Sequence, residues 1–339
     1  MSFWPLLKYA HNIAVRGQGA AEIILSEIAP IERIPDEITL SEGEVMMQQE
    51  ELVIVRRAYA KQILAVIGLQ DARLEFGFAS VPRERFLGPG PWQTFRGPGL
   101  YTPTPSMDQV YLYTDALIGI VPERGINNGQ PSLHAALLAA AMIGEGDHVV
   151  HIGAGTGYYA AIMATLAGAT GTLTAIECDP DLAMRARENL TSFPTIQVIP
   201  GNGSEALFPA ANVIYVNAGV THPAAVWLDG LAEGGRLILP LTTDASVRAA
   251  QGGMIDYAKM ARRGAVFLVE RRGANFHARW ICAAAYILAE GVRDSLAEQA
   301  LAKAFESGDP KGVTRLYRTD DVPQDRCWLH GSGWCLAYE

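Results

Sequence analysis

Short apolar runs alternate with helical patterns from residue 133 onward. The runs are rich in valine, isoleucine and leucine, and segments with helical spacing separate them. Apolar strands that alternate with helices are typical of a parallel sheet covered on both faces. The pattern predicts an α/β fold with strands at 148–153, 172–177, 196–201, 212–219 and 236–241. Helices are expected between them at 157–167, 179–190 and 224–235.

The flanking sequence suggests four parts. Residues 1–47 form an N-terminal extension, in which a helical segment precedes a polar linker. Residues 48–132 form a helical and loop region on the substrate side, with helices at 48–70 and 71–81 and a surface loop at 88–110. The main domain covers 133–290 and includes two further strands, at 252–262 and 264–272. We expect these two strands to form an antiparallel edge of the sheet. A C-terminal helix at 292–305 and a tail complete the last part, 291–339.

Composition narrows the function classes. The chain has 339 residues, of which 49% are hydrophobic, so it can build a substantial core. Its net charge is −9 and no cluster of lysine and arginine occurs, which disfavours nucleic-acid partners. The four cysteines contain no C-x-x-C pair, so we expect neither a metal site nor a disulfide framework. Without a long apolar span or a signal-type N-terminus, a cytoplasmic protein with no membrane association is expected.

A glycine-rich turn follows the first of these strands and opens a helix. Gly153, Gly155 and Gly157 alternate with single residues. In the dinucleotide fingerprint G-x-G-x-x-G, the third glycine allows close packing, but Tyr158 occupies that position here. The spacing argues against a dehydrogenase and suits a ligand without phosphates that lies close to the backbone. A tight turn with no ligand is the alternative.

Two polar residues end the neighbouring strands. Glu177 closes the second strand, where its carboxylate can accept hydrogen bonds from both hydroxyls of a ribose. Asn202 follows the third strand, where its amide can face an adenine. The alternative for Glu177 is a role in starting the helix at Asp179. Since ligands of such sheets bind at the carboxyl ends of the strands, we expect S-adenosyl-L-methionine as cofactor.

Several motifs together carry a family resemblance. They are VPRERF, YTDALIGI, NGQPSLHAALL, the glycine turn, GNGSEAL and LAEGGRLILPL, which fall between residues 81 and 241. In this combination the chain resembles class I methyltransferases, and among them the protein-L-isoaspartate O-methyltransferase family. The resemblance implies a Rossmann-like, mostly parallel, seven-stranded sheet with an N-terminal helical extension and a C-terminal α/β tail. It also implies that the three glycines line the methionine part of the cofactor, with Glu177 at the ribose and Asn202 near the adenine.

The resemblance implies a substrate as well. Family members methylate the free carboxylate of an abnormal L-isoaspartyl residue, so the partner would be a protein or peptide. The family's stretch G-Q-T-I-S-Q-P contains a serine that helps to hold this carboxylate, and Gly129 stands at its position here. Asn128, Ser132 or a backbone N–H at Gly129 would have to take over. The departure keeps open a relative that methylates another carboxylate or an amine, for example on a peptide natural product. A degenerate protein that binds the cofactor and acts through interactions is a third reading.

The predicted chemistry needs donors more than a base. A carboxylate is ionised at neutral pH, so a methyl acceptor of this kind needs only to be oriented and shielded from water. Asn127, Asn128 and Ser132 suit such a cage, although turn formation and helix capping explain the same residues. Asp115 would repel a carboxylate, so we expect it to orient another donor or to pair with an arginine. The sequence VNAGVTHP after the fourth strand lacks the [DN]-P-P-[YF] cluster of enzymes that methylate nucleic-acid amino groups, and it lacks clustered acidic metal ligands.

Other conspicuous side chains have plainer explanations. His134 lies on an apolar helix and is expected to be a core residue. Arg83 and Glu84 are expected to pair at the surface, and His222 to lie near the rim of the site. The tail tryptophans are expected to close a core: Trp328 and Trp334.

Overall fold

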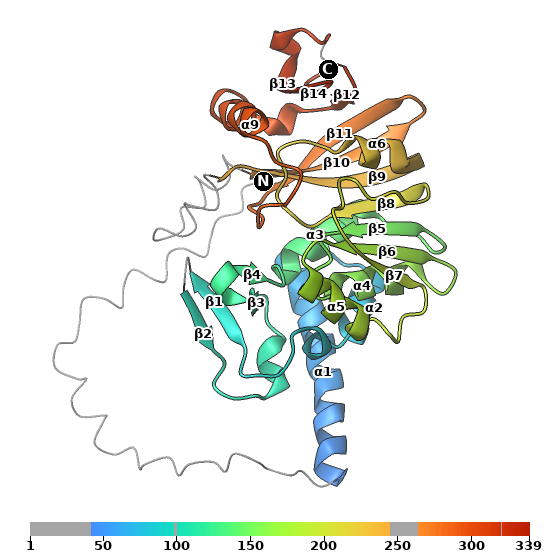
Figure 1. Cartoon of the computed structure of the whole chain (residues 1–339). Coiled ribbons are helices and arrows are strands. Elements are labelled where there is room, and N and C mark those ends of the chain that lie inside the picture. Colours follow the sequence, from blue (N-terminus) through green and yellow to red (C-terminus); the bar gives the residue numbers. More distant parts are fainter. Residues whose placement is uncertain (1–41, 98–99, 245–263, 320) are drawn as a thin grey trace, which may run out of the picture. The chain divides into compact units, whose positions relative to one another are not determined.

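The computed structural model describes residues 42–97, 100–244, 264–319 and 321–339 (Figure 1). The N-terminal segment up to residue 41 and the strand expected at 252–262 lie outside these residues. Contacts divide the chain between residues 48 and 49, and the unit from residue 49 onward is described below. Within the described residues, no helix is both long enough and apolar enough to cross a membrane.

A ten-stranded mixed sheet organises this unit, in the order β13-β14-β12-β11-β10-β9-β8-β5-β6-β7. The parallel strands are β5 (His148–Ile152), β6 (Thr172–Glu177), β7 (Ile196–Pro200), β8 (Ala211–Val216) and β9 (Leu231–Thr242). The antiparallel strands are β10 (Gly264–Arg272), β11 (Asn275–Ala283), β12 (Arg315–Tyr317), β13 (Cys327–Gly331) and β14 (Trp334–Ala337). The predicted α/β class is confirmed, and β12, β14 and β13 extend the sheet beyond the seven strands expected.

Strand β5 marks the point where the strand order reverses. The chain proceeds from β5 to β6 and β7 on one side, and then returns to β8 on the other. Such a point leaves a crevice at the carboxyl ends of the strands, where ligands of open α/β sheets bind. The fold therefore places a ligand crevice between the ends of β5 and β8.

The two faces of the sheet carry separate cores because the strands are apolar on both sides. Val149 packs with helices on one face, and the next residue, Val150, packs on the opposite face. The first face is covered by α1 (Glu42–Val66), α2 (Ala72–Ser80), α3 (Pro131–Ala141), α4 (Tyr158–Ala167) and α5 (Pro180–Asn189). The second face is covered by α6 (Ala225–Gly230) and α9 (Ser295–Ser307). The predicted boundary at 47/48 falls inside α1.

Helix α2 begins at a capping carboxylate. Asp71 accepts hydrogen bonds from the backbone N–H groups of Arg73 (2.9 Å) and Leu74 (3.0 Å). Replacing Asp71 by alanine should lower the free energy of unfolding by about 1 kcal/mol, because two N-terminal donors lose their acceptor. Urea unfolding measures this change. Glu50→Ala, on the exposed side of α1, serves as the control and should leave stability nearly unchanged.

Three sequence expectations are corrected here. The region 88–110 contains a hairpin of β1 (Gln93–Gly97) and β2 (Leu100–Pro103) in place of a plain loop. An edge-to-face contact between Phe95 and Tyr101 stabilises it, with ring centroids 5.5 Å apart. In the region 48–132, expected to consist of helices and loops, the structure also pairs β3 (Gly119–Val121) with β4 (Ile126–Asn127). Helix α6 is shorter than expected, since residues 231–235 already belong to β9.

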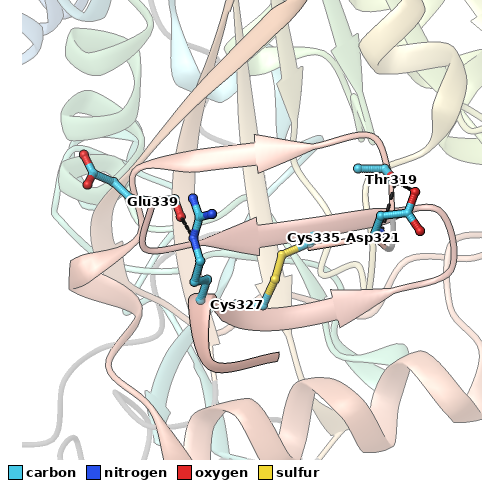
Figure 2. Close-up of a disulfide and its surroundings, with 6 residues drawn as sticks. Thr319, Asp321, Cys327, Cys335 and Glu339 are labelled. Carbon is cyan, nitrogen blue, oxygen red and sulfur yellow. Dashed lines mark hydrogen bonds between the residues drawn. A yellow bond between two sulfur atoms is a disulfide. The ribbon is translucent and has the colours of Figure 1, made fainter. Parts of the chain in front are cut away.

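The C-terminal tail adds a further correction and a confirmation. Cys327 and Cys335 form a disulfide across the β13–β14 hairpin, although the sequence suggested none (Figure 2). Their separation of eight residues brings them together only because a tight turn joins the two strands. Trp328 and Trp334 are buried, as expected, and the Trp328 indole donates to the carbonyl of Ala304 on α9 (3.1 Å). The tail is thus an integral part of the second core.

Candidate active site

The glycine turn after β5 has the backbone geometry that only glycine adopts easily. Gly153, Gly155 and Gly157 have φ values of 75°, 56° and 97°, all in the left-handed region. A Cβ on Gly157 would lie 2.8 Å from Leu190, so this glycine allows the packing of α4 against α5. A Cβ on Gly155 would meet no atom within 4 Å. Gly155 therefore presents bare backbone to open space, where a ligand can approach.

Glu177 joins the glycine turn to the end of β6. Its carboxylate accepts hydrogen bonds from the backbone N–H groups of Gly155 (2.6 Å) and Asp179 (3.0 Å). The residue is 5% exposed, and this burial raises the pKa of its carboxyl above the ordinary value, although the two N–H donors favour the ionised form. A buried acceptor therefore stands where the ends of two strands meet.

Asn202 lies in the turn after β7, and its side-chain oxygen and nitrogen form hydrogen bonds to residues of the same turn. Its Oδ1 accepts from the backbone N–H (3.0 Å) and the hydroxyl (2.8 Å) of Ser204, and its Nδ2 donates to Glu205 (2.9 Å). The amide lies against Gly291, where a Cβ would come within 2.5 Å of Nδ2. These contacts fix the orientation of the amide at the cleft.

One cleft brings most of the predicted cofactor residues together. Its walls include Gly153, Gly155, Glu177 and Asn202, with apolar side chains such as Ile152 from the core strands. Gly157 is not among the lining residues, because it belongs to the start of α4. Tyr158 and Tyr159 are buried in the core and are also absent from the walls, so neither ring blocks the cleft.

Two wall segments were missed by the sequence analysis. Residues 287–292 follow β11 and run along the end of β8, where Gly219 donates to Ile287 (2.7 Å) and accepts from Ala289 (2.9 Å). Arg124, which precedes β4, forms an ion pair of 2.5 Å with Asp179, and both residues line the cleft. Neither segment carries a motif, and only the three-dimensional fold brings them to the cofactor side.

The predicted substrate residues lie beside the cleft and not in its walls. Asn127 lines the cleft, whereas Asn128, Gly129 and Ser132 do not. The Asn128 side chain is buried and accepts from the backbone N–H of Ile118 (3.0 Å), which points to a structural role. Gly129 has a φ of +73°, and its N–H donates to the side chain of Asn127 (2.9 Å).

Asp115 orients the polar groups of this segment, as expected from its charge. Its carboxylate accepts from the hydroxyl (2.7 Å) and the backbone N–H (2.8 Å) of Ser132. The side chain of Gln130 also donates to it (3.1 Å). The Asp115 carboxylate thus anchors the start of α3, which follows Asn127 in the chain.

Arg83 and Glu84 do not pair at the surface, contrary to the prediction. Arg83 is fully buried and donates to the carbonyls of Thr114 and Ala116, at 2.9 Å each, and to Asn128 Oδ1 at 3.2 Å. Glu84 instead pairs with Arg56 and accepts from the Tyr113 hydroxyl. The guanidinium of Arg83 therefore stabilises the loop that carries Asp115.

The structure places His134 in the core and His222 away from the cofactor cleft. His134 is a core residue, as expected: its ring stacks on Tyr159 with centroids 3.6 Å apart, and its Nδ1 lies 2.8 Å from the Tyr215 hydroxyl. Burial holds the pKa of His134 well below its usual value, so the ring is neutral. His222 does not line the cofactor cleft but a separate cavity, 3.6 Å from a carboxylate oxygen of Asp294.

Comparison with known proteins identifies the family. The profile described as protein-L-isoaspartate(D-aspartate) O-methyltransferase matches residues 101–265. The protein-L-isoaspartate O-methyltransferase of Koribacter versatilis is 34% identical over 178 residues, which cover 51% of this chain and 70% of that protein. The chain belongs to the protein-L-isoaspartate O-methyltransferase family. It is an S-adenosylmethionine-dependent methyltransferase.

Other members of the family cover different shares of the chain. The protein-L-isoaspartate O-methyltransferase of Ignicoccus hospitalis is 37% identical over 115 residues, and the match spans 33% of this methyltransferase and 54% of that protein. A solved structure, described as a putative protein-L-isoaspartate O-methyltransferase from Plasmodium falciparum in complex with S-adenosyl-L-homocysteine, has a TM-score of 0.52 and 15% identity. It covers 69% of this chain and 97% of that one, so the two share the methyltransferase fold.

The cleft of this methyltransferase fits such a cofactor. S-adenosylmethionine supplies a methyl group on a sulfonium and contains no phosphate, which agrees with a turn that has Tyr158 where a pyrophosphate-binding helix has glycine. The bare backbone at Gly155 allows close approach, and Glu177 offers a buried acceptor. Among the residues that the structure describes, no cluster of metal-ligating side chains lies in the cleft.

Proposed function

We propose that this protein methylates the free carboxylate of L-isoaspartyl or D-aspartyl residues in a protein or peptide. The observation that carries the proposal is Asn127, which lines the cofactor cleft and whose amide Nδ2 makes only long contacts, to Gly125 and Tyr101. Relatives that are named for this activity support it. A carboxylate needs orientation by such donors and no general base.

Each side of the site has its own task in this proposal. Glu177 accepts hydrogen bonds from the ribose hydroxyls, Asn202 contacts the adenine, and Gly153 and Gly155 give the methionine part access to the backbone, while Gly157 shapes the turn. Asn127 donates its amide to the substrate carboxylate, because its present partners, Gly125 and Tyr101, are distant at 3.3 and 3.4 Å.

Ser132 supports this side of the site through Asp115. Its N–H and its hydroxyl both donate to the Asp115 carboxylate, so Ser132 anchors the segment that follows Asn127 and does not itself donate to the substrate. Gly129, which stands at the position of the family's serine, contributes only its backbone. We assign Asn128 to the support of this segment, since its Oδ1 is already used by Ile118 and Arg83.

One structural feature favours a second candidate, methylation of another carboxylate or an amine on a peptide. A Cβ at Gly129 would lie 2.2 Å from Nε2 of His134, so a serine at that position does not fit beside this ring. The site therefore departs from the family where the family holds its substrate. The assay below distinguishes the two candidates.

An isoaspartyl peptide tests the proposed substrate. The protein is incubated with this peptide and S-adenosylmethionine labelled in the methyl group, and volatile methanol is released by base. We expect base-labile label on the isoaspartyl peptide and none on its L-aspartyl counterpart. Base-stable label would identify an amine as the acceptor. No label on the isoaspartyl peptide, from a protein that binds the cofactor in calorimetry, would reject isoaspartyl methylation.

Replacing Ser132 by alanine tests the anchoring by Asp115. We expect kcat/KM for the isoaspartyl peptide to fall roughly 5- to 30-fold, or about 1–2 kcal/mol, because loss of the hydroxyl bond to Asp115 loosens the segment that follows Asn127. The Kd for S-adenosylmethionine should not change, because Ser132 does not line the cofactor cleft. Ser307→Ala, on the exposed end of α9, is the matched control. Unchanged kcat/KM in the Ser132 variant would exclude this role.

A further inference from the structure

Three side chains with metal-binding atoms meet on one face of the C-terminal hairpin. Cys335 on β14 lies directly opposite His330 on β13, and Cys327 lies opposite Ala337, two residues further along the same face. The ligand atoms of Cys327, His330 and Cys335 all lie within 4.8 Å of one another. Their spacing is Cys-x2-His-x4-Cys, and the turn between the strands is short.

The surroundings of this group favour a bound ligand. Cys335 is fully buried and Cys327 is 8% exposed, and Tyr317 and Val322 pack against them. His330 Nε2 is buried and has no hydrogen-bond partner among the described residues. An unpaired buried nitrogen is costly, and metal coordination is one way to satisfy an imidazole. The hairpin therefore contains two sulfurs and an unsatisfied nitrogen in one place.

We propose that Cys327, His330 and Cys335 bind a zinc ion when the two cysteines are reduced. Thiolate and imidazole are the ligands that Zn²⁺ prefers, and three protein ligands with one open position form a recognised class of site. In the disulfide form both sulfurs are bonded to each other, so this form holds no metal. The hairpin then has two stabilised states, one closed by the disulfide and one by the metal.

One of the three residues borders a cavity. His330 lines a cavity of about 690 Å³ between α6, α9 and the hairpin, whereas neither cysteine lines it. Its walls share Ser204 with the cofactor cleft. With three protein ligands, a zinc ion held here would take its fourth ligand from solvent, and His330 is the residue through which the cavity would reach it.

The reaction that converts the disulfide form of the hairpin into the zinc form needs only an external reductant, water and zinc. It uses no group from the cofactor site. A phosphine reductant breaks the S–S bond and becomes a phosphine oxide, with water supplying the oxygen and the two protons of the thiols. Zinc then replaces both thiol protons, which are released to solvent. Reducing compartments keep cysteines as thiols, so the metal form is the one expected there.

Metal titration of the full chain, with any affinity tag removed, tests the proposal. The protein is reduced with a phosphine, desalted without air and titrated with Zn²⁺ against a chromogenic chelator. We expect one equivalent of tight binding, and Co²⁺ should give tetrahedral ligand-field bands with thiolate charge-transfer absorption. The protein with its disulfide intact should bind no metal in this way.

Variants decide whether these three residues form the site. His330→Ala and Cys327→Ser should each weaken Zn²⁺ binding at least tenfold and remove the Co²⁺ spectrum. Cys282→Ser removes a free thiol on β11 and serves as the control. Absence of stoichiometric binding by the reduced wild type would overturn the proposal and leave a structural disulfide alone. Equal binding by the wild type and His330→Ala would overturn it as well.

Discussion

Replacement of Glu177 by alanine should weaken binding of S-adenosylmethionine by about 1–3 kcal/mol, or roughly 5- to 150-fold. The carboxylate is nearly buried at the end of β6, so hydrogen bonds to it are little screened by water. Its removal also leaves the N–H groups of Gly155 and Asp179 without their acceptor, which loosens the turn. Isothermal calorimetry measures the change in affinity.

A control variant and the raised pKa of Glu177 separate this effect from unfolding. Asp181→Ala, on the exposed first turn of α5, should leave the affinity unchanged. A carboxyl whose pKa is raised on folding stabilises the fold at low pH, and this contribution is lost as the pH rises through the folded pKa. Ionised Glu177 therefore costs stability at neutral pH, and this cost offsets the loss of its two N–H contacts, so the alanine variant should remain folded. An affinity equal to that of the wild type would remove Glu177 from the cofactor site.

The same raised pKa predicts how affinity depends on pH. The wild-type protein should bind the cofactor less tightly as the pH falls through the pKa of Glu177, because the protonated carboxyl is a weaker acceptor. The alanine variant should lack this part of the dependence. A common pH profile for both proteins would contradict the assignment.

Gly129→Ser, the change toward the family's sequence, should lower the free energy of unfolding by about 2–5 kcal/mol. The left-handed φ of +73° is strained for any residue with a Cβ. In addition, the new Cβ would lie 2.2 Å from His134, whose ring is held by Tyr159 and Tyr215. Urea unfolding followed by circular dichroism measures the loss.

Gly125 provides a matched control for this prediction. It has nearly the same φ, +72°, but a Cβ there would meet nothing within 4 Å. Gly125→Ser should therefore cost only the backbone strain of about 1 kcal/mol. The double variant Gly129→Ser/His134→Ala should recover the part of the loss that the clash causes. Equal losses for the two single variants would show that His134 does not exclude the serine.

Much of the fold and the cofactor side followed from local sequence. The strands β5, β6 and β8 are apolar on both faces, and the glycines of the turn have conformations that other residues resist, so pattern and chemistry agree. Glu177 and Asn202 could be placed because parallel strands end at one edge of the sheet. Such features depend on residues that are close in sequence.

The features that were missed depend on contacts between distant segments. Arg83 looked like a surface residue, but carbonyls about thirty residues further along receive its guanidinium. The wall at 287–292 carries no motif and is positioned by its hydrogen bonds to Gly219 and Thr221, which lie about seventy residues earlier. The disulfide required knowledge of the β13–β14 register. In each case, hydrophobic periodicity contains no information about the partner.

The three strands contributed by the tail also change where the sheet ends. Without them, the free N–H and C=O groups of β11 would form a long exposed edge, which invites pairing with another chain. Strand β12 covers this edge at Phe276 and His277, and the new border is β13, a strand of only five residues. The tail therefore protects the molecule against edge-to-edge aggregation, and a chain shortened at residue 290 would be expected to self-associate.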